Sequence, residues 1–177
     1  MKRMLLAASL LLTASSLFAE DPTSGKPVAA TKATFSISGL HCPPCTRTVE
    51  SSLRKQKGVK AVKVDWASKS AKIEFDETIL PVQQLAAAVA ATPHMMGGGL
   101  SYGSWLALSV PGIKDDASAK KAEMAVHDIK GVTSVGASAA RHTLSVQFAK
   151  DGNVSSQQLI DALEAAGFKA SNYQQSG

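Results

Sequence analysis

The chain has 177 residues, enough for one ordinary domain or two small ones, and a formal net charge of +5. This charge is small and dispersed, and only five Phe, two Tyr and two Trp are available for base stacking, which argues against a nucleic-acid-binding protein. The two cysteines, Cys42 and Cys45, are so close that a disulfide between them would close a very small loop and stabilise a fold little.

The N-terminus has the layout of a cleavable export signal. Two basic residues, Lys2 and Arg3, precede an uncharged apolar run over 4–12, and small residues then lead to an expected cut after Ala19. The apolar run is short for a membrane span, which needs roughly 20 residues. We therefore expect residues 1–19 to be a signal peptide and the mature protein to be periplasmic or secreted, without stable membrane insertion.

The first half of the mature chain begins with a segment at 20–32 that is rich in Pro, Ser, Gly and Ala and is predicted to be a flexible leader. Apolar and polar residues then alternate over 34–38, the period of a half-buried strand. From 44 to 57, Val49 and Leu53 follow Cys45 at four-residue spacing, which predicts a helix with these side chains on its buried face.

A hairpin and a second helix are expected next. Alternating runs at 59–66 and 71–75 are separated by a polar turn, the pattern of two paired strands. Pro81 then opens a helical pattern that continues to Thr92. The order of elements is therefore strand, helix, strand, strand, helix.

An internal repeat explains the second half of the chain. A shift of 73 residues places Gly58 on Gly131 and Phe75 on Phe148, with a final strand at 169–173. The predicted fold class is α+β, with two tandem ferredoxin-like βαββαβ domains, each an α/β sandwich. The first domain is expected at 33–102, and the second at 104–177.

The same shift shows that the second copy is degenerate at one loop. Cys42 falls on Asp115, and Cys45 falls on Ser118. The second copy therefore keeps the scaffold and lacks both sulfurs, so it cannot be an equivalent site for a soft metal ion.

The two cysteines stand where a strand gives way to a helix, and this spacing can direct both sulfurs at one soft metal ion. The positive end of a helix favours thiolate over thiol, and thiolates select Cu(I) and related ions over Mg(II) or Ca(II). Thiol–disulfide oxidoreductases also carry Cys-x-x-Cys at a helix start. The spacing alone leaves open a metal clamp and a redox pair.

The stretch Gly-Leu-His-Cys-Pro-Pro-Cys at 39–45, with Gly58-Val59 and a hairpin after the helix, resembles the heavy-metal-associated domain family. This family includes copper chaperones, the N-terminal domains of copper-pumping ATPases and the periplasmic mercury-binding protein. The resemblance implies that Cys42 and Cys45 bind one ion as a two-thiolate clamp. It also implies exchange of that ion with a metal-accepting or metal-donating protein, such as a copper-transporting ATPase domain.

The chain departs from the family pattern at two places. Leu40 replaces the usual Met as a buried plug under the loop. The second copy has the family's Ala-Gly-aromatic ending, whereas the first has Thr-Pro-His at 92–94, followed by Met95 and Met96. One hypothesis is that His94, Met95 or Met96 supplies a third ligand to the metal, and the other is that the Met pair packs under the Gly-rich loop.

His41 is also a candidate auxiliary ligand, because it adjoins Cys42. The leading prediction is a periplasmic soft-metal-binding protein that carries one Cu(I) ion as a metallochaperone and is not an enzyme. Hg(II), Ag(I), Zn(II) and Cd(II) are alternative ions, and a mercury(II)-binding transport protein and a thiol–disulfide oxidoreductase are alternative functions. A homodimer bridged by metal through four sulfurs is left open.

Overall fold

The computed structural model describes residues 30–174, so the predicted signal peptide and residues 20–29 of the predicted leader lie outside the described part. The first unit contains five elements: β1 (Thr31–Ser38), α1 (Pro43–Arg54), β2 (Val59–Asp65), β3 (Ser70–Phe75) and α2 (Val82–Ala90). Thr31 and Lys32, expected in the leader, extend β1 because they pair with Phe75 and Glu74 of β3. This order of elements is the predicted one.

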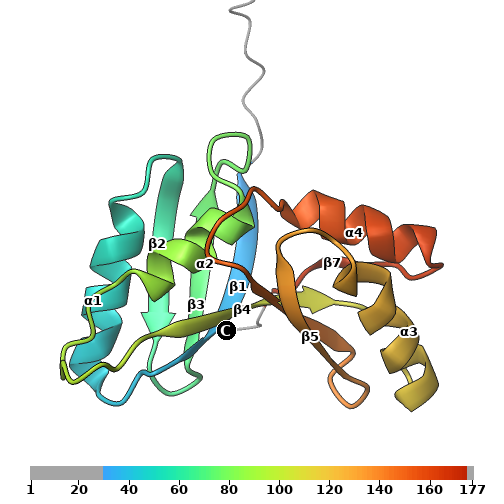
Figure 1. Cartoon of the computed structure of the whole chain (residues 1–177), viewed down its shortest axis with the longest axis horizontal. Helices are drawn as coiled ribbons and strands as arrows, with labels where there is room; N and C mark the ends of the chain where they lie inside the picture. Colours follow the sequence, from blue (N-terminus) through green and yellow to red (C-terminus); the bar gives the residue numbers. More distant parts are fainter. Residues whose placement is uncertain (1–29, 175–177) are drawn as a thin grey trace, which may run out of the picture.

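The remaining elements are β4 (Gly103–Ser109), α3 (Asp116–His127), β5 (Val132–Ser138), β6 (Thr143–Phe148), α4 (Ser156–Ala165) and β7 (Ser171–Asn172). The strands of both units form one antiparallel sheet, ordered β2-β3-β1-β4-β6-β5, with β7 paired to β4 (Figure 1). The α+β class with two ferredoxin-like βαββαβ units is thereby confirmed. No helix within residues 30–174 has both the length and the apolar character to cross a membrane.

The two units share strand β4. Residues 103–107 of this strand pair with β1, residues 106–109 pair with β6, and Leu108 and Ser109 pair with β7. β4 is thus the last strand of the first unit and the first strand of the second, where the sequence suggested a short link at 100–105. Because of this double use, the described chain needs eleven elements and not twelve.

The core lies on one face of this sheet. Phe35, Leu106 and Val146 stand in register across β1, β4 and β6, and all three are fully buried. Helix α1 contributes Cys45, Val49 and Leu53, which are each 0% exposed, as their four-residue spacing predicts. The hydrophobic cores of the two units are therefore continuous through β4.

The two units repeat their local hydrogen bonds as well as their topology. The Glu50 carboxylate on α1 accepts the Val64 N–H of β2 at 2.7 Å. In the second unit, Glu123 on α3 accepts the Ala137 N–H of β5 at 2.8 Å, which is the same pair shifted by 73 residues. This agreement supports the internal repeat from contacts that the sequence pattern did not use.

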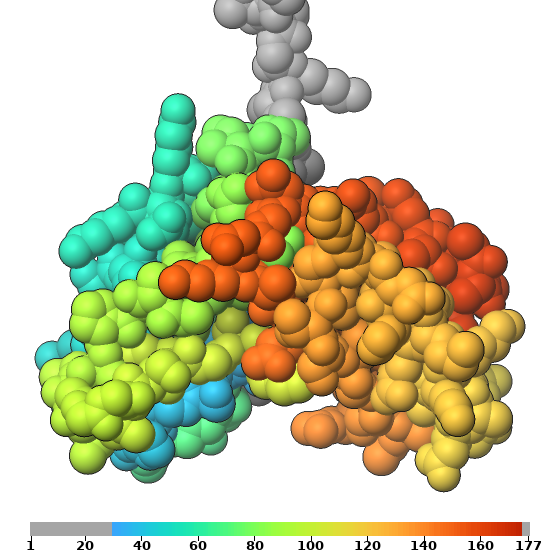
Figure 2. Space-filling view, viewed as in Figure 1, coloured from blue at the N-terminus to red at the C-terminus, as the bar shows by residue number. Residues whose placement is uncertain are grey.

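A buried glutamine ties the first unit to the second. The Gln83 side chain on α2 is 0% exposed, donates to the carbonyls of Ala149 and Asp151 at 2.9 Å, and accepts the Val154 N–H at 2.9 Å. In the space-filling view the orange 149–154 segment lies against green atoms at the centre of the molecule (Figure 2). The units are therefore joined by side chains as well as by β4.

Replacing Gln83 with Leu is expected to lower the free energy of unfolding by about 1–3 kcal/mol, since the buried Val154 N–H loses its partner. The measurement is urea unfolding followed by circular dichroism. Gln84 is the matched control, because it is exposed and makes one side-chain bond, to Asn153. Gln84→Leu is expected to change stability by no more than about 0.5 kcal/mol. Equal effects of the two substitutions would contradict this account.

Candidate metal centre

The two cysteines flank the start of helix α1. Cys42 is the N-cap, with extended backbone angles (φ −143°, ψ 151°), and Pro43 and Pro44 open the helix. Proline suits this position because its fixed φ fits the first turn and its missing N–H would have had no helical partner. The Cys45 N–H donates to the Cys42 carbonyl at 3.0 Å. The backbone thus turns at Cys42, and both sulfurs lie at the N-terminal end of α1.

Cys42 and Cys45 are joined by a disulfide, with their Cα atoms 5.4 Å apart. Cys45 is fully buried and Cys42 is half-buried, so the pair lies at the border of the core. Within residues 30–174 there is no cluster of three or more His, Cys, Asp or Glu side chains placed to hold a metal ion. Reduction of the disulfide would leave two neighbouring thiols at the helix start, which is the geometry of a two-sulfur clamp.

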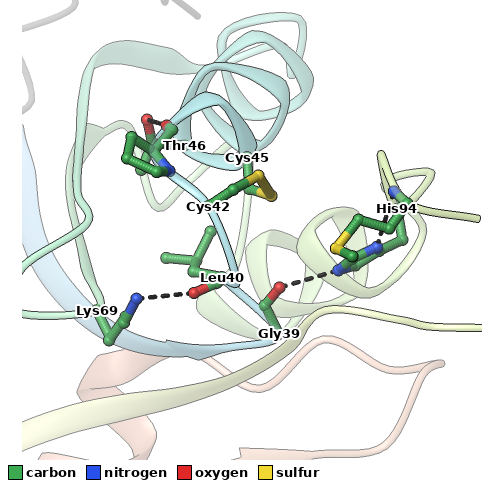
Figure 3. Close-up of a disulfide and its surroundings, with 9 residues drawn as sticks. Gly39, Leu40, Cys42, Cys45, Thr46, Lys69 and His94 are labelled. Atoms are coloured by element: carbon green, nitrogen blue, oxygen red, sulfur yellow. Dashed lines mark hydrogen bonds between the residues drawn. A yellow bond between two sulfur atoms is a disulfide. The ribbon is translucent and has the colours of Figure 1, made fainter.

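Two side chains from other elements hold the loop before Cys42. Leu40 is 4% exposed and fills the space under the loop, and its carbonyl accepts the Lys69 ammonium at 2.8 Å. The Gly39 carbonyl accepts a hydrogen bond from His94 Nε2 at 2.9 Å. Figure 3 shows these bonds on either side of the loop, with the disulfide directed toward the side on which His94 lies. The loop is therefore braced from the β2–β3 turn and from the segment after α2.

Both ring nitrogens of His94 are engaged. Nδ1 accepts the Met96 N–H at 3.2 Å, so the ring proton lies on Nε2, which donates to Gly39. The His94 ring is 9% exposed and packs on Tyr102, with the ring centroids 4.6 Å apart. In this arrangement His94 has no free lone pair for a metal ion.

The candidate auxiliary residues all lie at one corner of the first unit, which is formed by the 39–45 loop and by residues 92–97 after α2. His41 is exposed, and its ring centroid lies 5.5 Å from that of His94. Met95 and Met96 are 55% and 63% exposed, so they do not pack under the Gly-rich loop. The hypothesis that His41, Met95 or Met96 adds a ligand to the metal site stays a prediction, whereas His94 could do so only by giving up one of its two hydrogen bonds.

The equivalent corner of the second unit has the same frame and different chemistry. Asp115 replaces Cys42 as the helix N-cap and forms a capping box with Ser118, which replaces Cys45. Hydrogen bonds from the Ser118 hydroxyl and N–H hold the pKa of the Asp115 carboxyl below its usual value. Phe168 lies against Gly112, the equivalent of Gly39. An ionised carboxylate and a hydroxyl are poor partners for a soft ion.

Two further residues shape the site and were not predicted from the sequence, Lys69 and Tyr102. Lys69 has a positive φ of 51°, and the 73-residue shift places it on His142, which has the same φ. His142 Nδ1 also bonds the carbonyl of the equivalent plug residue, Ile113, at 2.6 Å. The alignment of Lys69 with His142 in the repeat was the feature of the sequence that could have pointed to Lys69. Tyr102 carried no signal, because its role depends on contact with His94.

Replacing Gly39 with Ala is expected to distort the metal loop and destabilise the protein. Gly39 has a φ of +83°, and a Cβ atom there would lie 2.6 Å from the Ser101 carbonyl oxygen. The left-handed backbone alone costs about 1–2 kcal/mol for a residue with a side chain, and the clash adds to it. The measurement is the free energy of unfolding together with the Cu(I) affinity of the reduced protein.

Gly97 is the matched control for this substitution. It also has a left-handed backbone (φ +61°), but a Cβ atom there would meet nothing within 4 Å. Gly97→Ala should therefore show the backbone cost alone and leave the Cu(I) affinity unchanged. An equal loss of affinity in both variants would contradict the role assigned to Gly39.

Comparison with known proteins agrees with this geometry. The model of the heavy-metal-associated domain matches residues 34–94 and 107–169, one match for each unit. The chain is 27% identical over 161 residues to copper-transporting ATPase 2 of Rattus norvegicus, which covers 76% of this chain and 11% of the ATPase. The chain thus spans only about a tenth of the length of this relative.

Two smaller relatives match a stretch of this chain about as long as one unit. Copper chaperone CopZ of Staphylococcus haemolyticus is 32% identical over 55 residues, which are 31% of this chain and 81% of CopZ. The periplasmic component of the mercuric transport protein of Shigella flexneri is 37% identical over 57 residues, which are 32% of this chain and 63% of that protein. Since the family model matches more than half of the residues, the chain belongs to the heavy-metal-associated domain family, a family of non-catalytic metal-binding domains, with two copies of the domain and one Cys-x-x-Cys pair.

Proposed function

We propose that the protein is a periplasmic carrier of one Cu(I) ion, held by Cys42 and Cys45 in their reduced form. The observation that supports this proposal is the placement of the two sulfurs at the start of α1, on a loop braced by Lys69 and His94. Two thiolates select a soft ion, and a two-coordinate ion remains open to attack by a third sulfur from an acceptor. The ion can then change hands without being released into water.

We favour copper over mercury because the similarity to a copper protein extends over more of the chain. The rat ATPase that matches across both units is a copper transporter by name, whereas the mercuric protein matches one unit alone. Hg(II) remains the second candidate because that single-unit match has the higher identity. The same clamp would bind Ag(I), Zn(II) or Cd(II) with affinities set by their softness.

The proposed partner is a protein that accepts or donates the ion through its own cysteines, such as a domain of a copper-transporting ATPase. The periplasmic location rests on the basic, apolar and small-residue segments of residues 1–19. A homodimer with one ion held by four sulfurs is the alternative use of the same clamp. Analytical ultracentrifugation with and without the ion separates the monomeric and dimeric complexes.

The test of the proposed function is a competition titration of Cu(I) against a strong chelator, with the fully reduced protein and with the disulfide form in parallel. The expected result is one tightly bound ion per chain in the reduced protein and an affinity for Cu(I) that falls by more than about 100-fold on oxidation to the disulfide. A parallel titration with Hg(II) gives the preference between the two ions. Equal Cu(I) affinity of the reduced and disulfide forms would overturn the thiolate clamp.

A further inference from the structure

Soft donor atoms other than thiolates gather beside the disulfide. The described residues contain four histidines and three methionines, and four of these seven side chains lie at this corner: His41, His94, Met95 and Met96. Imidazole nitrogen and thioether sulfur both suit Cu(I), and neither is lost when two cysteines form a disulfide. The corner therefore keeps soft donor atoms in the oxidised protein, in which the disulfide leaves no thiolate at Cys42 or Cys45.

The two methionines have no packing role in the structure. They occupy the middle of a turn closed by a bond from the Gly97 N–H to the His94 carbonyl at 3.0 Å. Their exposed fractions are 55% and 63%, although Met is usually a core residue that fills gaps. A Cβ atom at any of the three glycines after them, 97–99, would meet nothing within 4 Å, so the turn is surrounded by open space. Both thioether side chains are therefore accessible to an ion from solvent.

The turn is nevertheless fixed in place next to the loop. His94 anchors it, because its two ring nitrogens bond the Met96 N–H and the Gly39 carbonyl. His41 stands on the loop on the other side, exposed, with its ring centroid 5.5 Å from that of His94. One exposed imidazole and two exposed thioethers thus lie on the two sides of His94, which serves as the anchor and not as a ligand.

We propose that His41, Met95 and Met96 form a second, thiol-independent site for a soft monovalent ion, which operates when Cys42 and Cys45 are joined as a disulfide. The three donors would be the His41 imidazole and the two thioether sulfurs, a set that holds Cu(I) or Ag(I) and disfavours hard ions. This site goes beyond the thiolate clamp, since it needs neither cysteine. It would let the oxidised protein keep a metal ion that the disulfide alone cannot hold.

The test uses Ag(I), because this ion needs no reductant and leaves the disulfide intact. The disulfide form, shown free of thiols by a thiol reagent, is titrated in chloride-free buffer at slightly alkaline pH, where imidazoles are largely unprotonated. We expect one Ag(I) per chain, with an affinity that falls by about 10-fold or more in Met95→Leu/Met96→Leu and in His41→Ala. The methyl NMR signals of Met95 and Met96 should shift on binding, while that of Met124 does not.

Matched controls come from the second unit. Met124 is 66% exposed on α3 and His127 is exposed at the end of the same helix, so Met124→Leu and His127→Ala should leave the affinity unchanged. A Cys42→Ser/Cys45→Ser protein should bind Ag(I) as the disulfide form does. No binding, or binding that the Met95 and Met96 substitutions leave intact, would overturn this site and leave the thiolate clamp untouched. Conversely, failure of reduced protein to bind Cu(I) through its cysteines would overturn the clamp alone.

Discussion

Replacing both Cys42 and Cys45 with Ser is expected to lower the affinity for Cu(I), measured in reducing buffer, by more than about 100-fold relative to the wild type. Loss of a residue that only supports a ligand already costs roughly 10–100-fold in metal affinity, and here both ligands are lost. A serine hydroxyl is a hard donor that does not replace a thiolate for a soft ion. Competition titration against a strong Cu(I) chelator measures the difference between the variant and the wild type.

The two single variants sharpen this expectation. Cys42→Ser and Cys45→Ser each leave one sulfur, so each should bind Cu(I) far more weakly than the wild type and more tightly than the double variant. Because Cys45 is fully buried, circular dichroism must first show that the variants keep the fold. Tight binding by a folded double variant would show that the main Cu(I) site lies elsewhere.

Replacing Leu106 with Ala is expected to lower the free energy of unfolding by about 2–5 kcal/mol, the usual cost of removing a buried Leu side chain. Leu106 is fully buried, and on the shared strand it pairs with Phe35 of the first unit and with Val146 of the second. The cavity would therefore open in the core of both units. Hydrogen exchange of amides in β3 and in β6, followed during urea unfolding, measures the loss in each unit.

The expected result is one transition in which both strands lose protection together. Leu100→Ala is the control, because Leu100 is 47% exposed and its truncation should change stability by no more than about 0.5 kcal/mol. Two separate transitions, with β6 unaffected by the substitution in β4, would show that the units unfold independently. That outcome would contradict the continuous core.

The 73-residue repeat and the buried face of α1 could be predicted because both depend on local patterns. Strand β4 was harder, since Gly103–Trp105 reads as a short link and its pairing with β1 involves residues about 70 positions earlier. The redox state of the cysteine pair could not be predicted either, because the same spacing serves two thiols and one disulfide. His94 was a candidate ligand by residue type, and only the distant Gly39 carbonyl shows that its nitrogens are already bonded.

The shared strand also sets the distance between the two loops that the repeat relates. Ser38, at the end of β1, pairs with Gly103, so the cysteine loop lies at the start of β4. The equivalent loop of the second unit follows Ser109, at the other end of the same strand. Seven strand residues extend about 23 Å, too far for an ion to pass by direct ligand exchange. The two loops therefore lie at opposite ends of β4, and the second loop cannot serve as a direct acceptor for an ion held by the cysteines of the same chain.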